Sequence, residues 1–182
     1  MGTRHLICVV KDGAYKVAQY GQWDGYPSGQ GVNILDIIKS ETFDLEVFRK
    51  KVDRVRWITE TENKTIDENP NWTKEYPHLS RDCGSDILTH IFNADESLSL
   101  ANNLSFAGDS LFCEWAYVLN LDNDTLEVYK GFNEQPINEN ERFYGFNDPK
   151  SGYYPVKFLK EYDLHNLPSN EEFVNELDQK EE

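Results

Sequence analysis

The sequence has few basic residues for its length, and it contains no long apolar run. Eighteen Lys and Arg residues stand against 33 Asp and Glu residues, which gives a net charge of −15 over 182 residues. Proteins that bind nucleic acid by neutralising phosphates need a basic face, so this composition argues against direct nucleic-acid binding. No stretch approaches the roughly 20 apolar residues of a membrane-spanning helix, and the first ten residues do not fit a secretory signal. We therefore predict a cytoplasmic protein that does not contact a membrane.

Cysteine is also scarce, and its placement argues against two kinds of site. Cys8, Cys83 and Cys113 are an odd number of thiols and lie far apart in the sequence. Without a CxxC pair or a Cys/His cluster, neither a zinc site nor a disulfide framework is expected. We predict no metal and no cofactor.

What the sequence does contain is enough apolar material for a core. Hydrophobic residues make up 38% of the chain and aromatic residues 13%, which is typical of a folded protein and not of a disordered acidic tail. A chain of this length corresponds to one domain. We predict a single α+β domain over residues 1–168, followed by an acidic C-terminal helix or tail over residues 169–182.

Alternating apolar residues predict two β-hairpins and therefore a mainly antiparallel sheet. Residues 5–10 and 14–20 alternate as strands around a Lys-Asp-Gly turn. Residues 111–121 and 126–129 do so around an Asp-Asn-Asp-Thr turn, and residues 156–161 predict a further strand.

Apolar residues at helical spacing predict helices that pack on this sheet. Thr42 and Ser80 are the expected N-caps of two of them. The polar stretch 59–78 has no clear period and is predicted to be a loop, as is the aromatic stretch 131–155. The predicted helices span residues 32–40, 42–58, 80–93 and 170–177.

The most informative stretch for function is the glycine-rich segment 21–31, GQWDGYPSGQG. Its four glycines and one proline exclude a regular element and allow a ligand to approach the backbone closely. The spacing matches neither a P-loop nor a dinucleotide fingerprint. Two interpretations stay open: a ligand site, or a self-packed corner in which two aromatic rings plug the core. The candidate ligand-binding side chains are Gln22, Trp23, Asp24, Tyr26 and Gln30.

A second candidate is the segment 80–86 at the start of a predicted helix. Arg81 and Asp82 could position a polar ligand there, and a helix N-terminus would favour the thiolate of Cys83. No histidine lies at a telling spacing from this cysteine, so only the fold could supply a base. The alternative is that Ser80 and Asp82 serve the helix as cap and first-turn acid.

Several of these segments resemble a family without assigned activity that occurs in phages, bacteria and fungi. The resemblance rests on GTRHL at residues 2–6, on VAQYGQWDGYPSGQG at residues 17–31, and on shorter segments within residues 80–88 and 114–132. If the protein is phage-encoded, its location would be the host cytoplasm.

The opening of the chain is also similar, more weakly, to the N-terminal-nucleophile hydrolases. That likeness implies a layered sandwich, with Thr3 as the nucleophile and Asp24 on a polar loop after the second strand. Gly2 precedes Thr3, so removal of Met1 alone would not free the amine that these enzymes use as a base.

Three functional hypotheses follow. In the first, the segment 21–31 forms a pocket with Arg4, Arg81 and Asp82 for a small polar, nucleotide-like ligand. The same pocket could hydrolyse an amide-like C–N bond if Thr3 or Cys83 attacked while Arg4 and backbone amides held the oxyanion.

The second hypothesis is an acidic phage-encoded inhibitor that imitates the DNA backbone. Residues 1–58 carry a net charge of +2, so the net negative charge lies in residues 59–182. A basic partner such as a host nuclease would be steered to that part of the chain. The third is a non-catalytic assembly module whose aromatic stretch 143–154 is buried in an interface with a partner.

Overall fold

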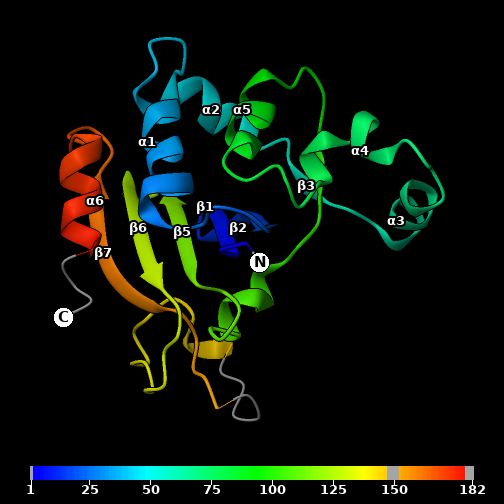
Figure 1. Cartoon of the computed structure of the whole chain (residues 1–182). Coiled ribbons are helices and arrows are strands. Elements are labelled where there is room, and N and C mark those ends of the chain that lie inside the picture. The colour runs from blue at the N-terminus through cyan, green and yellow to red at the C-terminus, as the bar shows by residue number, and fades with distance from the viewer. Residues whose placement is uncertain (1, 147–151, 179–182) are drawn as a thin grey trace.

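A mixed five-stranded sheet forms the centre of the fold in the computed structural model, which describes residues 2–146 and 152–178 (Figure 1). The strands lie in the order β2-β1-β5-β6-β7. β1 and β5 are parallel, and the other neighbours are antiparallel. The structure thus confirms the α+β class, the mainly antiparallel sheet and both predicted hairpins. The strands are β1 (His5–Lys11), β2 (Ala14–Gly21), β5 (Trp115–Asn120), β6 (Thr125–Lys130) and β7 (Lys157–Asp163).

The turns of the two hairpins are tied together. Asp12 and Gly13 have positive φ angles of 54° and 71°, as a two-residue hairpin turn requires. Their backbone N–H groups donate to the carboxylate of Asp122 in the second turn, at 2.7 and 2.9 Å. These two hydrogen bonds lower the pKa of Asp122. The acidic turn residues therefore help to fix how the hairpins lie in one sheet.

Helices cover one face of the sheet, and irregular segments cover the other. Ile7 and Val9 of β1 pack under the helices, whereas Leu6 and Cys8 alternate to the opposite face. α1 and α6 lie over the strands, and α2 packs against α5 (Figure 1). The helices of this layer are α1 (Val32–Lys39), α2 (Leu45–Val52), α5 (Asp86–Asn93) and α6 (Asn170–Asp178).

α6 is an integral part of this layer. Phe173 and Leu177 on its inner side are fully buried in the core under the helices. The predicted helix over 170–177 is thus confirmed, while residues 179–182 lie outside the described residues. None of the helices in the described ranges is long and apolar enough to cross a bilayer.

A small lobe projects from the sheet at the right of Figure 1. It is attached where two short parallel strands, β3 (Arg56–Trp57) and β4 (Ser99–Leu100), pair with each other. The described residues therefore contain one large sheet and this two-stranded pair, and the layered sandwich of the hydrolases is not confirmed. The lobe is built from α3 (Glu60–Asp67), α4 (Trp72–Glu75) and the 3₁₀ turn η2 (Pro77–Leu79).

Four details of the predicted elements are wrong. The helix expected over 42–58 is capped by Asp44, whose carboxylate accepts from two backbone N–H groups, and it ends at Val52. The helix expected from Ser80 begins at Asp86, because the Ser80 hydroxyl accepts from the Asp82 backbone and forms a turn instead. Residues 59–78 are largely helical, since Thr59 and Glu62 form a capping box. Residues 27–31 form a π-helical turn, η1 (Pro27–Gly31), that leads into α1.

The remaining regular turns lie on the face without helices. They are the 3₁₀ turns η3 (Leu104–Gly108) and η4 (Tyr144–Phe146). Phe143 is buried there, where its ring meets Tyr129 edge-on and is tilted against Phe146. Part of the predicted aromatic loop therefore belongs to the apolar core on this face of the sheet.

Candidate functional site

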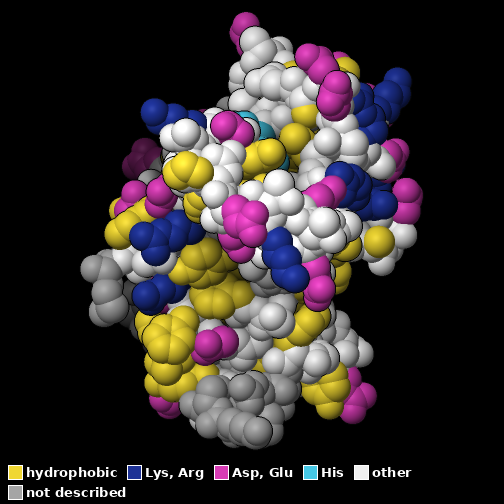
Figure 2. Space-filling view, turned by 90° about the vertical axis from the view of Figure 1, so that its right-hand side faces the viewer, with side chains coloured by type: hydrophobic (Ala, Val, Ile, Leu, Met, Phe, Trp, Pro, Cys, Tyr) yellow, Lys and Arg dark blue, Asp and Glu magenta, His cyan; other side chains and the backbone are white. Residues whose placement is uncertain are grey.

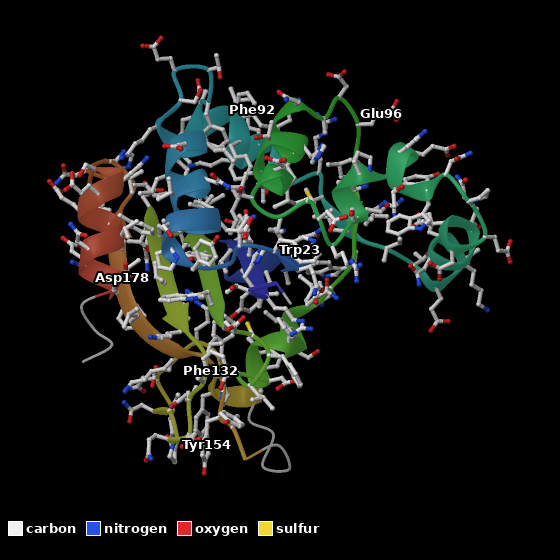
Figure 3. All side chains as sticks on the ribbon, in the orientation of Figure 1. Trp23, Phe92, Glu96, Phe132, Tyr154 and Asp178 are labelled. Atoms are coloured by element: carbon white, nitrogen blue, oxygen red, sulfur yellow. The ribbon has the colours of Figure 1, made fainter. Side chains whose placement is uncertain are left out.

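The structure brings the two sequence-predicted segments, 21–31 and 80–86, into one corner of the molecule. The Gln22 N–H donates to the Arg81 carbonyl at 3.0 Å, and the Trp23 indole N–H donates to the Asp82 carboxylate at 2.6 Å. Gln30 accepts from the Ser85 backbone at 2.9 Å. Trp23 lies between the sheet and the lobe (Figure 3). Segments about 60 residues apart in the sequence therefore form a single surface.

Within this corner, the polar side chains mostly bind one another. The Gln22 side-chain oxygen accepts from the Tyr20 hydroxyl at 2.6 Å. The Tyr26 hydroxyl donates to Asp24 at 3.1 Å, and the Gln30 amide donates to the Trp23 carbonyl at 3.2 Å. The corner is thus held by its own hydrogen bonds. The predicted plug is nevertheless wrong, because Trp23 and Tyr26 stay 44% and 40% exposed.

Cys83 does not have the environment of a reactive thiol. It precedes the N-cap of α5, Ser85, and packs against the core under the helices. Burial raises the pKa of Cys83 to about 12, and the nearby Asp86 adds to the shift. The expectation that a helix N-terminus favours the Cys83 thiolate is therefore wrong.

We expect Cys83 to react with iodoacetamide at pH 8 at least about a hundredfold more slowly than a free thiol, because so little thiolate is present. Intact-mass spectrometry of the native protein over time measures the rate. Cys8 and Cys113 are fully buried, so a Cys83→Ser variant identifies any label at this position. Labelling of Cys83 at the rate of a free thiol would contradict this assignment.

Thr3 and Arg4 precede β1 and have different surroundings. The Thr3 carbonyl accepts from the Gly25 N–H at 2.9 Å and so anchors the glycine-rich segment. The Arg4 guanidinium lies 5.5 Å above the centre of the Phe112 ring, and the Arg4 backbone N–H donates to Glu114 at 3.2 Å. Thr3 and Tyr26 line one pocket, and that pocket contains none of the other predicted site residues.

This pocket, which we call the sheet-end pocket, has a volume of about 730 Å³. It lies where β5 begins and β6 ends. Figure 1 shows that α1 and α6 cover the upper part of these strands, whereas the lower ends extend below the helices. The pocket is lined by Thr3, Tyr26, Glu114, Trp115, Lys130, Gly131, Phe132, Asn133, Lys157, Phe158 and Leu159.

The strand register explains why charged and aromatic groups meet in the sheet-end pocket. Trp115 of β5 and Lys130 of β6 are directly opposite each other, and the ammonium group of Lys130 lies 5.4 Å above the Trp115 ring. Lys157 of β7 is opposite Lys130 in turn. Adjacent strands thus place two lysines side by side, and the first of them lies over an aromatic ring.

Charge distinguishes the sheet-end pocket from the two other large pockets of the described residues. Two lysines and one glutamate line it. A pocket of about 450 Å³ beside the lobe is lined by Arg56, Glu62 and Glu75, and the first two form an ion pair at 2.6 Å. A pocket of about 550 Å³ on the other side of β6 has three glutamates and one arginine. Of the three, the sheet-end pocket alone has more basic than acidic side chains in its lining.

The pocket on the other side of β6 contains a buried ion pair. Glu127 accepts from the Nε and Nη2 atoms of Arg142 at 2.8 and 2.7 Å, from the Tyr129 hydroxyl at 2.5 Å and from the Asn120 amide at 3.1 Å. Burial opposes ionisation of Glu127, but the hydrogen bonds from Arg142 and Tyr129 outweigh it and lower the pKa. Because both carboxylate oxygens are satisfied within the protein, this cluster has a structural role.

Neither a metal centre nor a known relative helps to define the site. Within residues 2–146 and 152–178, no group of three or more His, Cys, Asp or Glu side chains could hold a metal ion. No protein-family model matches the sequence, and the curated proteins and solved structures contain no match to it. The likenesses to a phage family and to hydrolases therefore stay predictions.

Charged side chains of both signs lie on the side of the molecule from which the lobe projects (Figure 2). Figure 2 shows Asp and Glu side chains on this face interspersed with Lys and Arg and with exposed apolar groups. A DNA mimic would present a continuous acidic surface to its basic partner. This face does not have one, and the inhibitor and assembly hypotheses stay predictions.

Proposed function

We propose that the protein binds a small anionic ligand in the sheet-end pocket. The observation that carries this proposal is that two lysines on adjacent strands, Lys130 and Lys157, line one pocket in a protein whose net charge is −15. A volume of about 730 Å³ is within the range of natural small-molecule sites. This site differs from the predicted one, because Tyr26 is the only residue of the glycine-rich segment 21–31 that lines the pocket.

The side chains of the sheet-end pocket suit binding better than covalent chemistry. Thr3 offers a hydroxyl as a hydrogen-bond donor, and Lys157 is an exposed cation at the pocket wall. Cys83, the other predicted nucleophile, does not line the pocket. Hydrolysis of a C–N bond by Thr3 would require a free amine at this residue, which intact-mass spectrometry of the purified protein can detect as loss of Met1 and Gly2.

We expect a Lys157→Gln substitution to weaken the binding of ribose 5-phosphate about tenfold, because a charge-assisted contact to phosphate is lost. Isothermal titration calorimetry measures the dissociation constant. The matched control is Lys50→Gln on α2, an exposed lysine outside the pocket, which should bind the probe as the wild type does.

Two results would contradict the proposed function. One is that neither ribose 5-phosphate nor pyrophosphate binds the wild type at millimolar concentration. The other is that Lys157→Gln and Lys50→Gln weaken binding equally, because that would indicate a general effect of net charge and not a contact in the pocket.

A further inference from the structure

Phe132, at the rim of the sheet-end pocket, has an unusual backbone conformation. Its φ angle is 52°, in the left-handed region that a bulky side chain rarely adopts, because Cβ then lies too close to the carbonyl oxygen. At the same time the side chain is 53% exposed. Figure 3 shows Phe132 at the lower end of the sheet, below the helices.

The neighbouring residues hold Phe132 in this conformation. Its N–H donates to the Ser110 carbonyl at 2.6 Å, and the next N–H, of Asn133, donates to the Ser110 hydroxyl at 3.1 Å. The preceding N–H, of Gly131, donates to the Glu114 carbonyl at 2.8 Å. Three consecutive backbone groups are thus bound to the segment before β5, which fixes the direction in which the ring projects.

Neither the backbone nor the core accounts for a phenylalanine at this position. Glycine would adopt the positive φ without steric conflict, and a half-exposed ring contributes little to the core. Strain that the surrounding structure maintains is typical of residues that contact ligands. Two further rings of the pocket, Tyr26 and Phe158, are each 40% exposed. The pocket therefore combines exposed aromatic rings with two lysines.

We propose that the ligand of the sheet-end pocket is a nucleotide, whose base stacks on Phe132 while its phosphate binds near Lys130 and Lys157. This inference rests on the proposed function and adds the ligand class and a specificity-determining residue. Aromatic side chains stack on any base, since every base has a flat π-face. A nucleotide carries both a flat base, which can stack on an aromatic ring, and a phosphate, which can bind a lysine. The aromatic rings and lysines of the pocket match these two groups.

The test compares nucleoside monophosphates with a probe that lacks the base. AMP, GMP, CMP, UMP and ribose 5-phosphate are titrated by calorimetry into the wild type and into Phe132→Leu, Phe132→Tyr and Tyr144→Leu. Stacking on one aromatic ring corresponds to roughly a five- to hundredfold gain in affinity. We expect at least one nucleotide to bind the wild type tighter than ribose 5-phosphate by a factor in this range.

The variants assign that gain to the ring of Phe132. Phe132→Leu should remove the advantage of the nucleotide and leave ribose 5-phosphate unaffected, whereas Phe132→Tyr should retain it. Tyr144→Leu removes another exposed ring, 46% exposed and outside the pocket, and should change neither affinity. Thermal denaturation of Phe132→Gly tests whether the ring is needed for folding. We expect a Tm equal to or above that of the wild type, because glycine adopts the positive φ without strain.

Failure of this inference can be separated from failure of the proposed function. If ribose 5-phosphate and all four nucleotides bind equally tightly, the pocket binds anions but the base contributes nothing, and the nucleotide inference is overturned. The same holds if Phe132→Leu weakens both kinds of probe equally and lowers the Tm, since Phe132 is then a structural residue. If no phosphate-containing probe binds, both proposals are overturned.

Discussion

Replacing Arg142 with methionine is expected to lower the free energy of unfolding at pH 7 by about 3 kcal/mol, measured by urea denaturation. The substitution removes both hydrogen bonds from the guanidinium to Glu127, a residue of β6 that is only 5% exposed. An unpaired carboxylate then stays buried. Breaking a buried ion pair usually costs about 3–5 kcal/mol, and the lower end of this range applies because the Arg142 side chain is 21% exposed.

The pH dependence of this loss identifies its cause. Without Arg142, the hydrogen bonds and the charge that lower the pKa of Glu127 most are lost, while burial still raises it, so the pKa is higher in the variant than in the wild type. The folded variant would then bind a proton near pH 4 and relieve the buried charge, so its deficit relative to the wild type should be smaller at pH 4 than at pH 7. A deficit that is the same at both pH values would indicate lost packing instead.

A double variant supplies the matched control. In Glu127→Gln/Arg142→Met no charge is left buried, and the amide oxygen still accepts from Tyr129. We expect this protein to recover at least about 1 kcal/mol of the loss seen with Arg142→Met alone. The single variant Glu127→Gln completes the comparison. If the stability loss of the double variant equals the sum of the losses of Glu127→Gln and Arg142→Met, Glu127 is not a buried charge held by Arg142.

His5 is expected to make the protein less stable as the pH falls below neutrality. The ring is buried against Gly21, where a Cβ atom would lie only 2.1 Å from it. Burial lowers the pKa of His5 to about 4, although the nearby Asp24 acts in the opposite direction. The unfolded chain, with a His5 pKa of about 6.5, therefore binds the proton first. Between pH 7 and pH 4.5 this linkage removes about 2–3 kcal/mol of stability.

Urea denaturation at pH 7 and pH 4.5 tests this expectation in variants that do not titrate at residue 5. His5→Phe and His5→Gln differ in shape, and each should lose about 2–3 kcal/mol less than the wild type over this interval. His165→Gln is the control for the loss of a histidine that is not buried: its side chain is 66% exposed and lies 3.0 Å from Asp124. Equal losses in the wild type and in both His5 variants would refute the buried neutral histidine.

The sequence predicted the strands of the main sheet better than the helices. Alternation and turn residues identified both hairpins, because the Asp12-Gly13 turn and the two faces of each strand are local properties. Thr59 and Glu62 carry a capping-box signal that was readable but outweighed by the polar composition of the stretch. The short pair β3–β4 joins residues more than 40 positions apart, and two-residue strands have no detectable period.

The candidate site was less accessible to sequence reasoning. The pocket residues come from five separate segments. The order of the strands and the hydrogen bond from Gly25 to the Thr3 carbonyl bring them together: Thr3, Tyr26, Trp115, Lys130 and Lys157. The four glycines and one proline of the segment 21–31 predict an irregular loop, although residues 27–31 form a π-helical turn. The segment's hydrogen bonds to residues 81–85, one from the backbone of Gln22 and two that involve the side chains of Trp23 and Gln30, depend on the fold and could not be predicted from the sequence.

The parallel pairing of β1 with β5 governs the order in which the chain can assemble. The paired residues, such as His5 and Trp115, are 110 positions apart. During synthesis the first hairpin must therefore wait, with one apolar edge unpaired, until β5 leaves the ribosome. Closing so long a loop opposes folding entropically, and contacts of this range are characteristic of slow-folding proteins. In the interval the strand His5–Lys11 is the segment of the sheet most in need of protection from self-association.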